Sequence, residues 1–487
     1  MIRIQPGLWV SHPAYGDGRV VTRIGAVARV DFLGDEIDVD ADVLELVEQK
    51  PPTVVGEPLG EEGEAISSLS RQKYFSSIEA INLGVVPPDA EQLLHFTMNG
   101  AALTKKIRSD LDSAPSKGLC KVVLGHYGTG KTHYLQLVRA VALQSGWVVS
   151  LVEFDPKAAD PAKPHLVYRH LMSALEFPPR EDGTVAKGFL GLVKEVRAHW
   201  MRADIRHLPL FSKNPWLFDG LNTLLAHHHD EDDERYVAAC SWLAGDKQLS
   251  TIRGLGSEGR VAARVPSMPV SKEAAEIYAF HLAVVDEIVK QLGYKGLLLI
   301  LDEAEHVRGY TVRRQERANN FFDYLARCAH PPMDTGDTPT RNEHGYELPD
   351  FWTNGPLFGL YVGLTPAYGI PQTREECVFI RSPKDDLILT QPPSTDDYRA
   401  WTDKLFQMFH QYCPHEAELF STDDRRARIS AAMVKRYAVY RDSNTPLRNW
   451  IKLGGFACSV PLVDKACNET SLIEQLTETG EQIASPY

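Results

Sequence analysis

The stretch from residue 121 to residue 146 constrains the fold of this chain more than any other. An apolar, β-prone run ends at Leu124, three glycines follow within six residues, and a helical pattern opens at Lys131. Glycines in such a turn let backbone N–H groups converge on phosphate oxygens at a helix N-terminus, where the partial positive charge of the helix lies. The spacing GxxxxGK[ST], between a strand and a helix, therefore predicts a P-loop that binds ATP. The expected nucleotide-contacting residues are Gly125, His126, Tyr127, Gly128, Thr129, Gly130, Lys131, Thr132 and His133.

Two residues of this loop have specific expected roles. Lys131 should reach the β- and γ-phosphates, and the Thr132 hydroxyl should be a ligand of Mg²⁺. The alternative interpretation is a glycine-rich turn without any ligand. The strand before the turn and the helix after it count against that alternative, because they are the context that a P-loop requires.

A second part of the predicted site is a buried-type strand that ends in two acids, Asp302 and Glu303. Because the carboxyl ends of parallel strands meet at one edge of a sheet, these acids should lie beside the phosphates. Asp302 would hold the Mg²⁺ shell, and Glu303 would orient and activate the attacking water. The alternative is that both acids are solvated caps of the following helix.

Single threonine and arginine residues complete the candidate site. Thr365 ends the next strand, where its hydroxyl would bond the γ-phosphate or the attacking water. Arg448 sits at a helix start after turn residues and would reach the phosphates from a lid. Arg374 and Arg381 are candidates for an arginine that acts on the nucleotide of a neighbouring subunit. The alternative interpretations are that Thr365 is an ordinary threonine at a strand end and that the arginines are ordinary surface residues.

Two further charged runs invite a functional interpretation. Arg308, Arg313, Arg314 and Arg317 follow the acidic strand end, and their helical spacing is most often that of a solvated face. Contact with DNA or with a partner protein is the alternative. The run from His227 to Glu234 resembles a metal cluster in composition, but such a run is usually a hydrated loop, and we predict no metal there.

The chain divides into four expected parts, with an α/β fold at its centre. Residues 1–49 hold short β-prone runs between turn residues, which predicts a small all-β barrel. Residues 50–67, rich in Pro, Gly and Glu, are the expected linker. Residues 68–394 form the expected core, a parallel sheet with helices on both faces and a helical insertion at about 165–293. Residues 395–487 are expected to form a helical lid and a C-terminal tail.

The bulk composition limits the partners and the compartment. The net charge of -13 argues against a protein whose whole surface coats nucleic acid, although a local basic groove is compatible with it. The seven cysteines are scattered and never in CxxC spacing, which is typical of free thiols in a reducing compartment. The first residues lack the apolar core of a signal peptide, and no apolar run is long enough to cross a membrane. The expected compartment is the cytoplasm.

The order of these features is similar to that of AAA+ ATPases: a P-loop, a helical insertion, an Asp-Glu strand, a Thr-ended strand and a helical lid. Within that class the chain resembles the ATP-binding proteins of bacterial phage-exclusion (BREX) clusters, the BrxD-like group related to Orc/Cdc6 initiators. The resemblance covers about residues 70–455. The runs that carry it are Ile78-Glu79-Ala80-Ile81-Asn82-Leu83-Gly84-Val85-Val86-Pro87, Gly125-His126-Tyr127-Gly128-Thr129-Gly130-Lys131-Thr132-His133-Tyr134-Leu135, Gly293-Tyr294-Lys295-Gly296 and Leu301-Asp302-Glu303-Ala304-Glu305.

A shorter resemblance concerns the start of the chain. The run from Trp9 to Val20, followed by Val30-Asp31-Phe32, resembles the Tudor or SH3-like modules of some bacterial helicases and transcription factors. Those modules bind protein partners or duplex DNA, so the resemblance implies a recruiting role and leaves the ligand open.

The larger resemblance implies an ATPase that works on DNA beside other defence proteins, such as a helicase or a methyltransferase. Two departures matter. The Tudor-like module is not part of the family core, and only 37 residues follow Trp450, too few for the winged-helix DNA reader of Orc/Cdc6 proteins. Sequence-specific reading of DNA is therefore not expected. The trans-acting arginines would require a nucleotide-dependent homo-oligomer.

Three functions are compatible with these observations. The favoured one is an ATPase that couples ATP binding and hydrolysis to assembly or movement on DNA with partner proteins. The second is an ATP-bound switch or scaffold with negligible turnover, which recruits partners through the Tudor-like module. The third, a kinase of a small metabolite or nucleotide, would need a second substrate pocket that no motif indicates.

Overall fold

The computed structural model forms two compact units. Unit 1 comprises Met1–Phe96, Thr395–Ser443 and Asn449–Tyr487, and unit 2 comprises Thr97–Ser394 and Asn444–Arg448. The residues that the structure describes are 9–12, 16–24, 27–32, 35–40, 44–46, 68–83, 86–87, 90–180, 184–199, 205–227, 234–245, 274–330, 347–366, 379–380, 382, 384–440 and 447–484.

Unit 2 is built on a six-stranded sheet with the strand order β11-β6-β10-β9-β7-β8. Neighbouring strands run parallel, except that the edge strand β8 pairs antiparallel with β7. Every residue of β9 and β10 is buried, which explains why both strands are nearly continuous apolar runs in the sequence. The strands are β6 (Cys120–Leu124), β7 (Val148–Glu153), β8 (Leu175–Glu176), β9 (Leu297–Asp302), β10 (Gly359–Leu364) and β11 (Leu387–Leu389).

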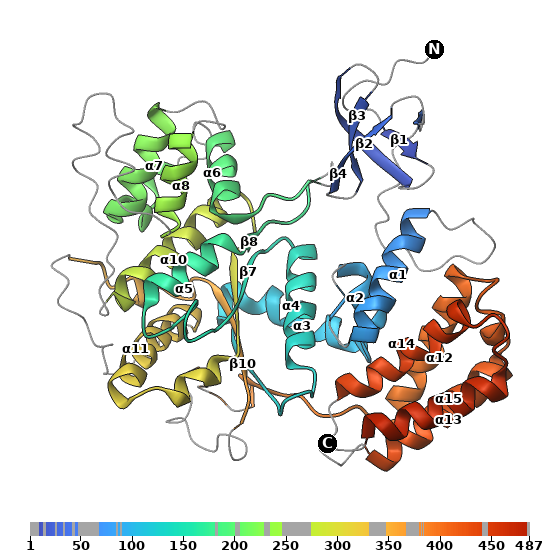
Figure 1. Ribbon diagram of the computed structural model, residues 1–487. Coiled ribbons are helices and arrows are strands. Elements are labelled where there is room, and N and C mark those ends of the chain that lie inside the picture. The colour runs from blue at the N-terminus through green and yellow to red at the C-terminus, as the bar shows by residue number, and fades with distance from the viewer. Residues whose placement is uncertain are drawn as a thin grey trace. The chain divides into compact units, whose positions relative to one another are not determined.

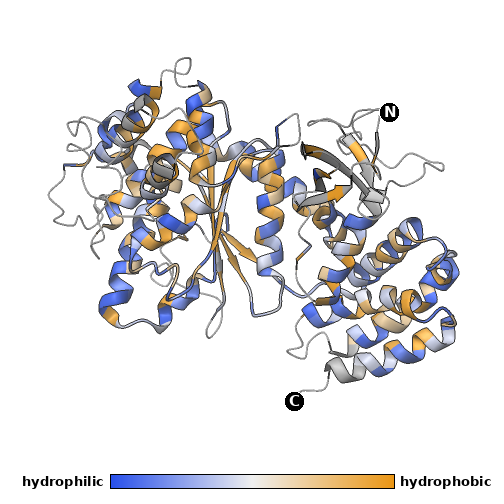
Figure 2. Ribbon diagram, turned by 45° about the horizontal axis from the view of Figure 1, so that its top comes forward, coloured by the Kyte–Doolittle hydropathy of each residue, from blue (hydrophilic) through white to orange (hydrophobic). Residues whose placement is uncertain are grey.

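Helices cover both faces of this sheet. α3 and α4 lie on one face, and α5, α10 and α11 lie on the other (Figure 1). Figure 2 shows that the strands are hydrophobic along their length while the helices carry both hydrophobic and hydrophilic residues, as expected for helices that bury one face. The helices are α3 (Gly100–Lys117), α4 (Lys131–Gln144), α5 (Pro164–Ser173), α6 (Gly188–His199), α7 (Pro215–His227), α8 (Glu234–Leu243), α10 (Ala275–Gln291) and α11 (Val312–Ala329). The 3-10 turns are η2 (Ile205–His207), η3 (Phe211–Lys213), η4 (Ala304–Gly309) and η5 (Phe351–Asn354).

A buried acid on α10 fixes the start of strand β9. Asp286 is 1% exposed, and its Oδ1 accepts a hydrogen bond of 2.8 Å from the backbone N–H of Leu297. Its Oδ2 lies 2.6 Å from Nζ of Lys290, one helical turn further along. Burial raises the pKa of Asp286 to about 6 although the lysine opposes that shift. The contact anchors the strand that ends in the two acids predicted for the site.

The helical insertion expected at about 165–293 corresponds in its described residues to helices α5 to α8 and α10. The short strand β8 also falls in this span, where the sequence pattern indicates an almost wholly helical segment. β8 has two residues, and its pairing with β7 depends on long-range contact and not on local periodicity. The expected domain boundaries stay predictions.

The N-terminal part of unit 1 is a five-stranded antiparallel sheet with the order β4-β3-β2-β1-β5. Its small core consists of Val10, Val20, Ala28, Val30, Val39 and Leu44. The strands are β1 (Trp9–His12), β2 (Gly16–Ile24), β3 (Val27–Phe32), β4 (Asp35–Asp40) and β5 (Glu45–Leu46). Closure of this sheet into a Tudor-like barrel stays a prediction, and residues 50–67, the expected linker, lie outside the described residues.

The remainder of unit 1 is helical. Its core includes the ring of Tyr74, which stacks on Tyr412 with centroids 4.7 Å apart, and the ring of Tyr398, which stacks on Tyr437 at 4.6 Å. The helices are α1 (Ser68–Leu83), α2 (Ala90–Phe96), α12 (Thr395–Tyr412), α13 (Asp423–Tyr440), α14 (Leu447–Val463) and α15 (Glu469–Ala484), with the 3-10 turn η7 (Glu418–Phe420). Within the residues that the structure describes, no helix combines the length and the apolar character needed to span a membrane.

Truncation of a central strand residue should destabilise unit 2. Leu299 in β9 is 0% exposed, so Leu299→Ala should lower the free energy of unfolding by about 2–5 kcal/mol, through lost apolar burial and the cavity left behind. Urea denaturation followed by circular dichroism measures the change. Leu389→Ala, at a leucine of the edge strand β11 that is 44% exposed, is the matched control and should change little. Equal effects of the two substitutions would contradict the central position of β9.

Candidate functional site

The glycine-rich loop occupies the place that the sequence predicts, between the end of β6 at Leu124 and the start of α4 at Lys131. Two of its residues, Gly128 and Gly130, have φ values of 79° and 93°. These values lie in the left-handed region, which glycine reaches without steric cost. Gly130 is also the N-cap of α4 and has no side chain to cap the helix, so the first N–H groups of α4 remain open toward a ligand.

The first glycine of the loop is required by packing. A Cβ atom at Gly125 would collide with the hydroxyl oxygens of Thr129 and Thr390. Those two hydroxyls are hydrogen-bonded to each other at 2.7 Å, and the backbone N–H of Thr390 donates to the carbonyl of Leu124 at 2.9 Å. Thr390 directly follows β11, the neighbour of β6, and therefore supports the base of the loop. Its role depends on strand order, which no local motif reveals.

Lys131 contacts the threonine that ends β10. The lysine is 5% exposed, and its Nζ donates a hydrogen bond of 2.7 Å to Oγ1 of Thr365. The backbone carbonyl of Thr365 accepts a second hydrogen bond, of 2.7 Å, from the guanidinium of Arg308 in η4. The structure thus brings together Lys131, the first residue of α4, and Thr365, which follows β10. Arg308 is an additional residue that holds the threonine from its main-chain side.

Thr132 contacts the first acid of strand β9. Its hydroxyl donates a hydrogen bond of 2.8 Å to Oδ2 of Asp302, and Oδ1 of the same carboxylate accepts 2.9 Å from the backbone N–H of Glu303. Asp302 is 3% exposed. A hydroxyl and a carboxylate are hard oxygen ligands of the kind that Mg²⁺ takes from proteins, usually one or two beside phosphates and water. The pair therefore fits the Mg²⁺ of a bound nucleotide.

A glycine of β10 makes room for this carboxylate. A Cβ atom at Gly363 would collide with Oδ1 of Asp302 and would lie 2.9 Å from Cδ1 of Leu135. Gly363 is thus a site-supporting residue that sequence reasoning missed. The available signal was a lone glycine inside an apolar strand, which often marks a close approach of backbone to another group.

Glu303 has an unusual backbone and a perturbed carboxyl. Its φ is 60°, a left-handed conformation that residues other than glycine seldom adopt outside turns and functional sites. Partial burial raises the pKa of the carboxyl, repulsion from Glu305 and Asp302 adds to the rise, and Lys131 opposes it. Oε2 lies 4.0 Å from Nε2 of His306. Glu303 is the N-cap residue of η4 but makes no side-chain cap hydrogen bond, which removes support from the capping interpretation.

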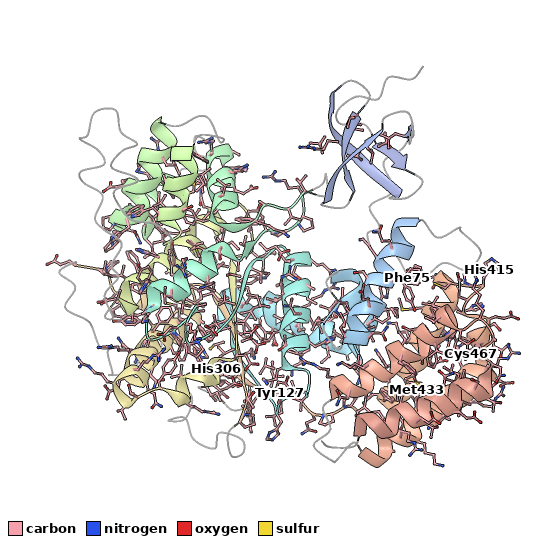
Figure 3. The ribbon with its side chains drawn as sticks, viewed as in Figure 1. Phe75, Tyr127, His306, His415, Met433 and Cys467 are labelled. Carbon is pink, nitrogen blue, oxygen red and sulfur yellow. The ribbon has the colours of Figure 1, made fainter. Side chains whose placement is uncertain are left out.

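Tyr127 and Arg448 meet on the outer side of the loop. Tyr127 is 68% exposed, and its phenol oxygen accepts a hydrogen bond of 3.3 Å from Nη1 of Arg448. The guanidinium carbon lies 5.7 Å from the centre of the tyrosine ring. The backbone N–H of Leu447 donates to the carbonyl of Gly128 at 3.1 Å. Figure 3 labels Tyr127, which projects from the lower side of unit 2 in that view.

The other expected nucleotide-contacting residues have different surroundings. The ring of His133 is hydrogen-bonded to Oγ1 of Thr97 at 2.9 Å, and burial lowers its pKa to about 4, so the ring is neutral near pH 7. The backbone carbonyl of His126 accepts a hydrogen bond of 2.8 Å from the hydroxyl of Thr129. Arg374 and Arg381 lie outside the described residues.

No metal cluster of three or more His, Cys, Asp or Glu side chains occurs within the described ranges of the chain. Most of the run between His227 and Glu234 lies outside those ranges. The prediction that this run holds no metal therefore stays a prediction.

A parallel sheet with a glycine-rich loop before α4, and with an acid at the end of β9 in contact with that loop, defines the class of P-loop nucleotide-binding proteins. The family model of the "BREX system ATP-binding protein BrxC/D" matches residues 69–328, more than half of the chain. The chain therefore belongs to this family and is an ATP-binding protein of a phage-defence system. The matched span contains Lys131, Asp302 and Glu303, whereas Thr365 and Arg448 follow it. None of the curated proteins matches the chain.

Loss of the loop lysine should weaken ATP binding. Lys131→Ala removes a buried cation, and hydrogen bonds to charged groups contribute about 1.5–3 kcal/mol each, so the Kd for ATP should rise about tenfold or more. Titration with a fluorescent ATP analogue measures it. Lys117→Ala, at an exposed lysine of α3, is the control and should leave the Kd unchanged. An unaltered Kd for Lys131→Ala would refute the phosphate contact.

A side chain at residue 363 should disturb the metal-dependent part of binding. Gly363→Ala must displace the Asp302 carboxylate, so it should reduce the gain in ATP affinity that Mg²⁺ gives and lower stability by about 1–3 kcal/mol. ATP titrations with Mg²⁺ and with EDTA measure the ratio of affinities. Gly309→Ala, where an added Cβ meets nothing within 4 Å, should keep the wild-type ratio. The same ratio in both variants would argue against Asp302 as part of the Mg²⁺ shell.

Proposed function

We propose that this protein is a AAA+ ATPase, which hydrolyses ATP and couples the turnover to action on DNA together with partner proteins of its defence system. One observation carries the proposal: the two acids at the end of β9 adjoin the P-loop, and one of them is bonded to Thr132. A protein that only retained ATP would need the loop and the metal ligands. It would not need a second acid with a raised pKa beside them.

The residues of the chain divide the work in a way that suits phosphoryl transfer. The backbone N–H groups between Gly125 and the first turn of α4 bind the phosphate oxygens, and Lys131 neutralises charge on the β- and γ-phosphates. Thr132 and Asp302 would hold Mg²⁺, and the bound ion would neutralise charge that builds up on the phosphate oxygens. Little covalent chemistry is asked of the protein, because positioning and charge stabilisation provide most of the acceleration.

Glu303 is the proposed base that orients the attacking water. Its backbone has the left-handed conformation that is found at functional sites, and its N–H donates a hydrogen bond to Oδ1 of Asp302. A raised carboxyl pKa suits a group that takes a proton from water, since the best base has a pKa near the working pH. A base with a raised pKa becomes protonated at a higher pH than an ordinary glutamate. As the pH is lowered, turnover should therefore begin to fall at a pH above the ordinary glutamate pKa.

The AAA+ assignment is supported by the strand order and by Thr365. Strands β6, β10 and β9 are consecutive neighbours in the sheet, so the loop, the threonine and the two acids lie on adjacent strand ends. In our proposal, the hydroxyl of Thr365, which is hydrogen-bonded to Lys131, detects the γ-phosphate. Arg448, in the first turn of α14, also detects it. Arg374 or Arg381 would complete the site of a neighbouring subunit in a nucleotide-dependent homo-oligomer.

The partner proteins are proposed from the family and from the N-terminal sheet. Membership of the BREX family supports partners among the other components of that system. A helicase-like or methyltransferase-like protein is the proposed partner, and the N-terminal module is the proposed recruiting element. The cytoplasm is the proposed compartment.

An ATP-bound switch with negligible turnover is the second candidate. The contacts of Leu447 and Arg448 with Gly128 and Tyr127 favour it, because any rearrangement of the loop around a nucleotide would move the start of α14 whether or not ATP is hydrolysed. Steady-state turnover with and without duplex DNA distinguishes the two functions. Tight nucleotide retention with no turnover under any of these conditions would favour the switch.

Replacement of the proposed base should separate binding from hydrolysis. Glu303→Gln keeps the size of the side chain and removes the base, so the turnover rate should fall about 100-fold or more while the Kd for ATP stays near the wild-type value. Phosphate release and nucleotide titration measure the two quantities. Glu153→Gln is the matched control, because Glu153 is an exposed glutamate at the end of β7. In the parallel register of the two strands it lies opposite Asp302 of β9. Turnover at the wild-type rate in Glu303→Gln would show that the role assigned to this residue is wrong.

A further inference from the structure

A concave pocket lies in unit 2, apart from the residues assigned to ATP. It has a volume of about 310 Å³, and four of its lining residues are cations. The lining residues that matter here are Asp160, Lys163, Thr311, Arg313, Arg314 and Arg317. The sequence alone suggests a solvated helix face for the arginines, but a concave surface with residues from two separate segments is a different arrangement.

The fold places two helix starts at this pocket. Lys163 is the N-cap residue of α5 and Thr311 is the N-cap residue of α11, and neither makes a side-chain cap hydrogen bond. The two helices follow the loops after β7 and β9, which are parallel neighbours in the sheet. The positive ends of both helix dipoles therefore add to the positive potential of the side chains.

One arginine of the pocket is part of the framework. Arg314 donates a hydrogen bond of 2.9 Å to Oδ2 of Asp160, a carboxylate that is 0% exposed, and another of 3.1 Å to the carbonyl of Pro156. Its guanidinium carbon lies 3.7 Å from the centre of the Tyr310 ring. Oδ1 of Asp160 accepts 3.0 Å from the backbone N–H of Ala162. The one acid in the lining is thus already neutralised, and Arg314 ties the start of α11 to the loop after β7.

The other three cations of the lining are bound less closely to acidic side chains than Arg314 is. Arg313 and Arg317 are one turn apart on α11, and neither forms an ion pair with any side chain in the part of the chain that the structure describes. Nζ of Lys163 lies 3.8 Å from Oδ2 of Asp160, which is longer than a hydrogen bond. Three positive groups therefore line a pocket whose only acid is paired with a fourth.

We propose that this pocket binds a phosphate group, either of a nucleic-acid backbone or of a free phosphorylated small molecule. Guanidinium groups match the oxygens of phosphate with paired N–H donors, and helix N-termini favour the same anion. Arg313 and Arg317 would contact the phosphate oxygens, Lys163 would supply charge from the opposite segment, and Arg314 would position the start of α11. The identification of the phosphate as part of a nucleic acid rests on the proposed action on DNA. The binding of a phosphate group as such does not depend on that proposal.

The DNA arm of the test uses full-length protein with a non-hydrolysable ATP analogue and Mg²⁺ in the P-loop. Fluorescence anisotropy with a labelled duplex, and separately with a labelled single strand, is measured over a series of salt concentrations. For Arg313→Gln combined with Arg317→Gln, we expect a Kd raised about tenfold and a slope of log K against log salt reduced by about 1–2. Lysine at both positions should restore most of the slope, because it keeps the charge.

The second arm uses inorganic phosphate, titrated by calorimetry into the same analogue-bound protein so that the P-loop is already filled. Binding that is lost in the double glutamine variant, with DNA binding unaltered, would assign the pocket to a free phosphorylated molecule. Lys105→Gln combined with Lys106→Gln, at exposed positions of α3, removes the same charge from the same unit and should change neither readout. The pocket proposal is overturned if the pocket and control variants behave alike in both arms, and this result leaves the outcome of Glu303→Gln on ATP turnover unaffected.

Discussion

The site depends on the parallel register of three central strands. Leu364 of β10 pairs with Leu124 of β6, and Val362 of β10 pairs with Leu301 of β9, so the three strands end at the same edge of the sheet. The chain segments that follow these ends are the glycine-rich loop, Thr365 and the acidic pair. Parallel strands of this kind are possible only with both faces covered, which is why the helices between them are as much a requirement of the site as the loop itself.

Close packing at this edge leaves little freedom in the choice of residues. The carboxylate of Asp302 occupies space that a side chain at residue 363 would need, and the Thr129 and Thr390 hydroxyls occupy space that a side chain at residue 125 would need. Both glycines thus serve side-chain atoms of neighbouring strands. The geometry of the phosphate-binding edge is therefore set partly by residues that would never touch the nucleotide.

The sequence was most informative where local pattern and strand order coincide. The loop, Asp302 and Thr365 could be predicted because each stands at the end of an apolar run, and parallel runs must end together. Thr390 and Arg308 could not, since their contacts depend on which strands and turns become neighbours across more than 50 residues. The edge strand β8 could not be predicted for a related reason, because a strand of two residues has no recognisable periodicity.

Thr365 is held from both of its ends, and this has a consequence for communication within unit 2. Lys131 of the ATP site binds its hydroxyl, while Arg308 of η4 binds its carbonyl, and η4 leads directly into the first turn of α11. If a ligand at the start of α11 alters the position of η4, it changes the affinity for ATP by some factor. Thermodynamic reciprocity then requires that ATP change the affinity for that ligand by the same factor. The two events would report on each other without any contact between the ligands.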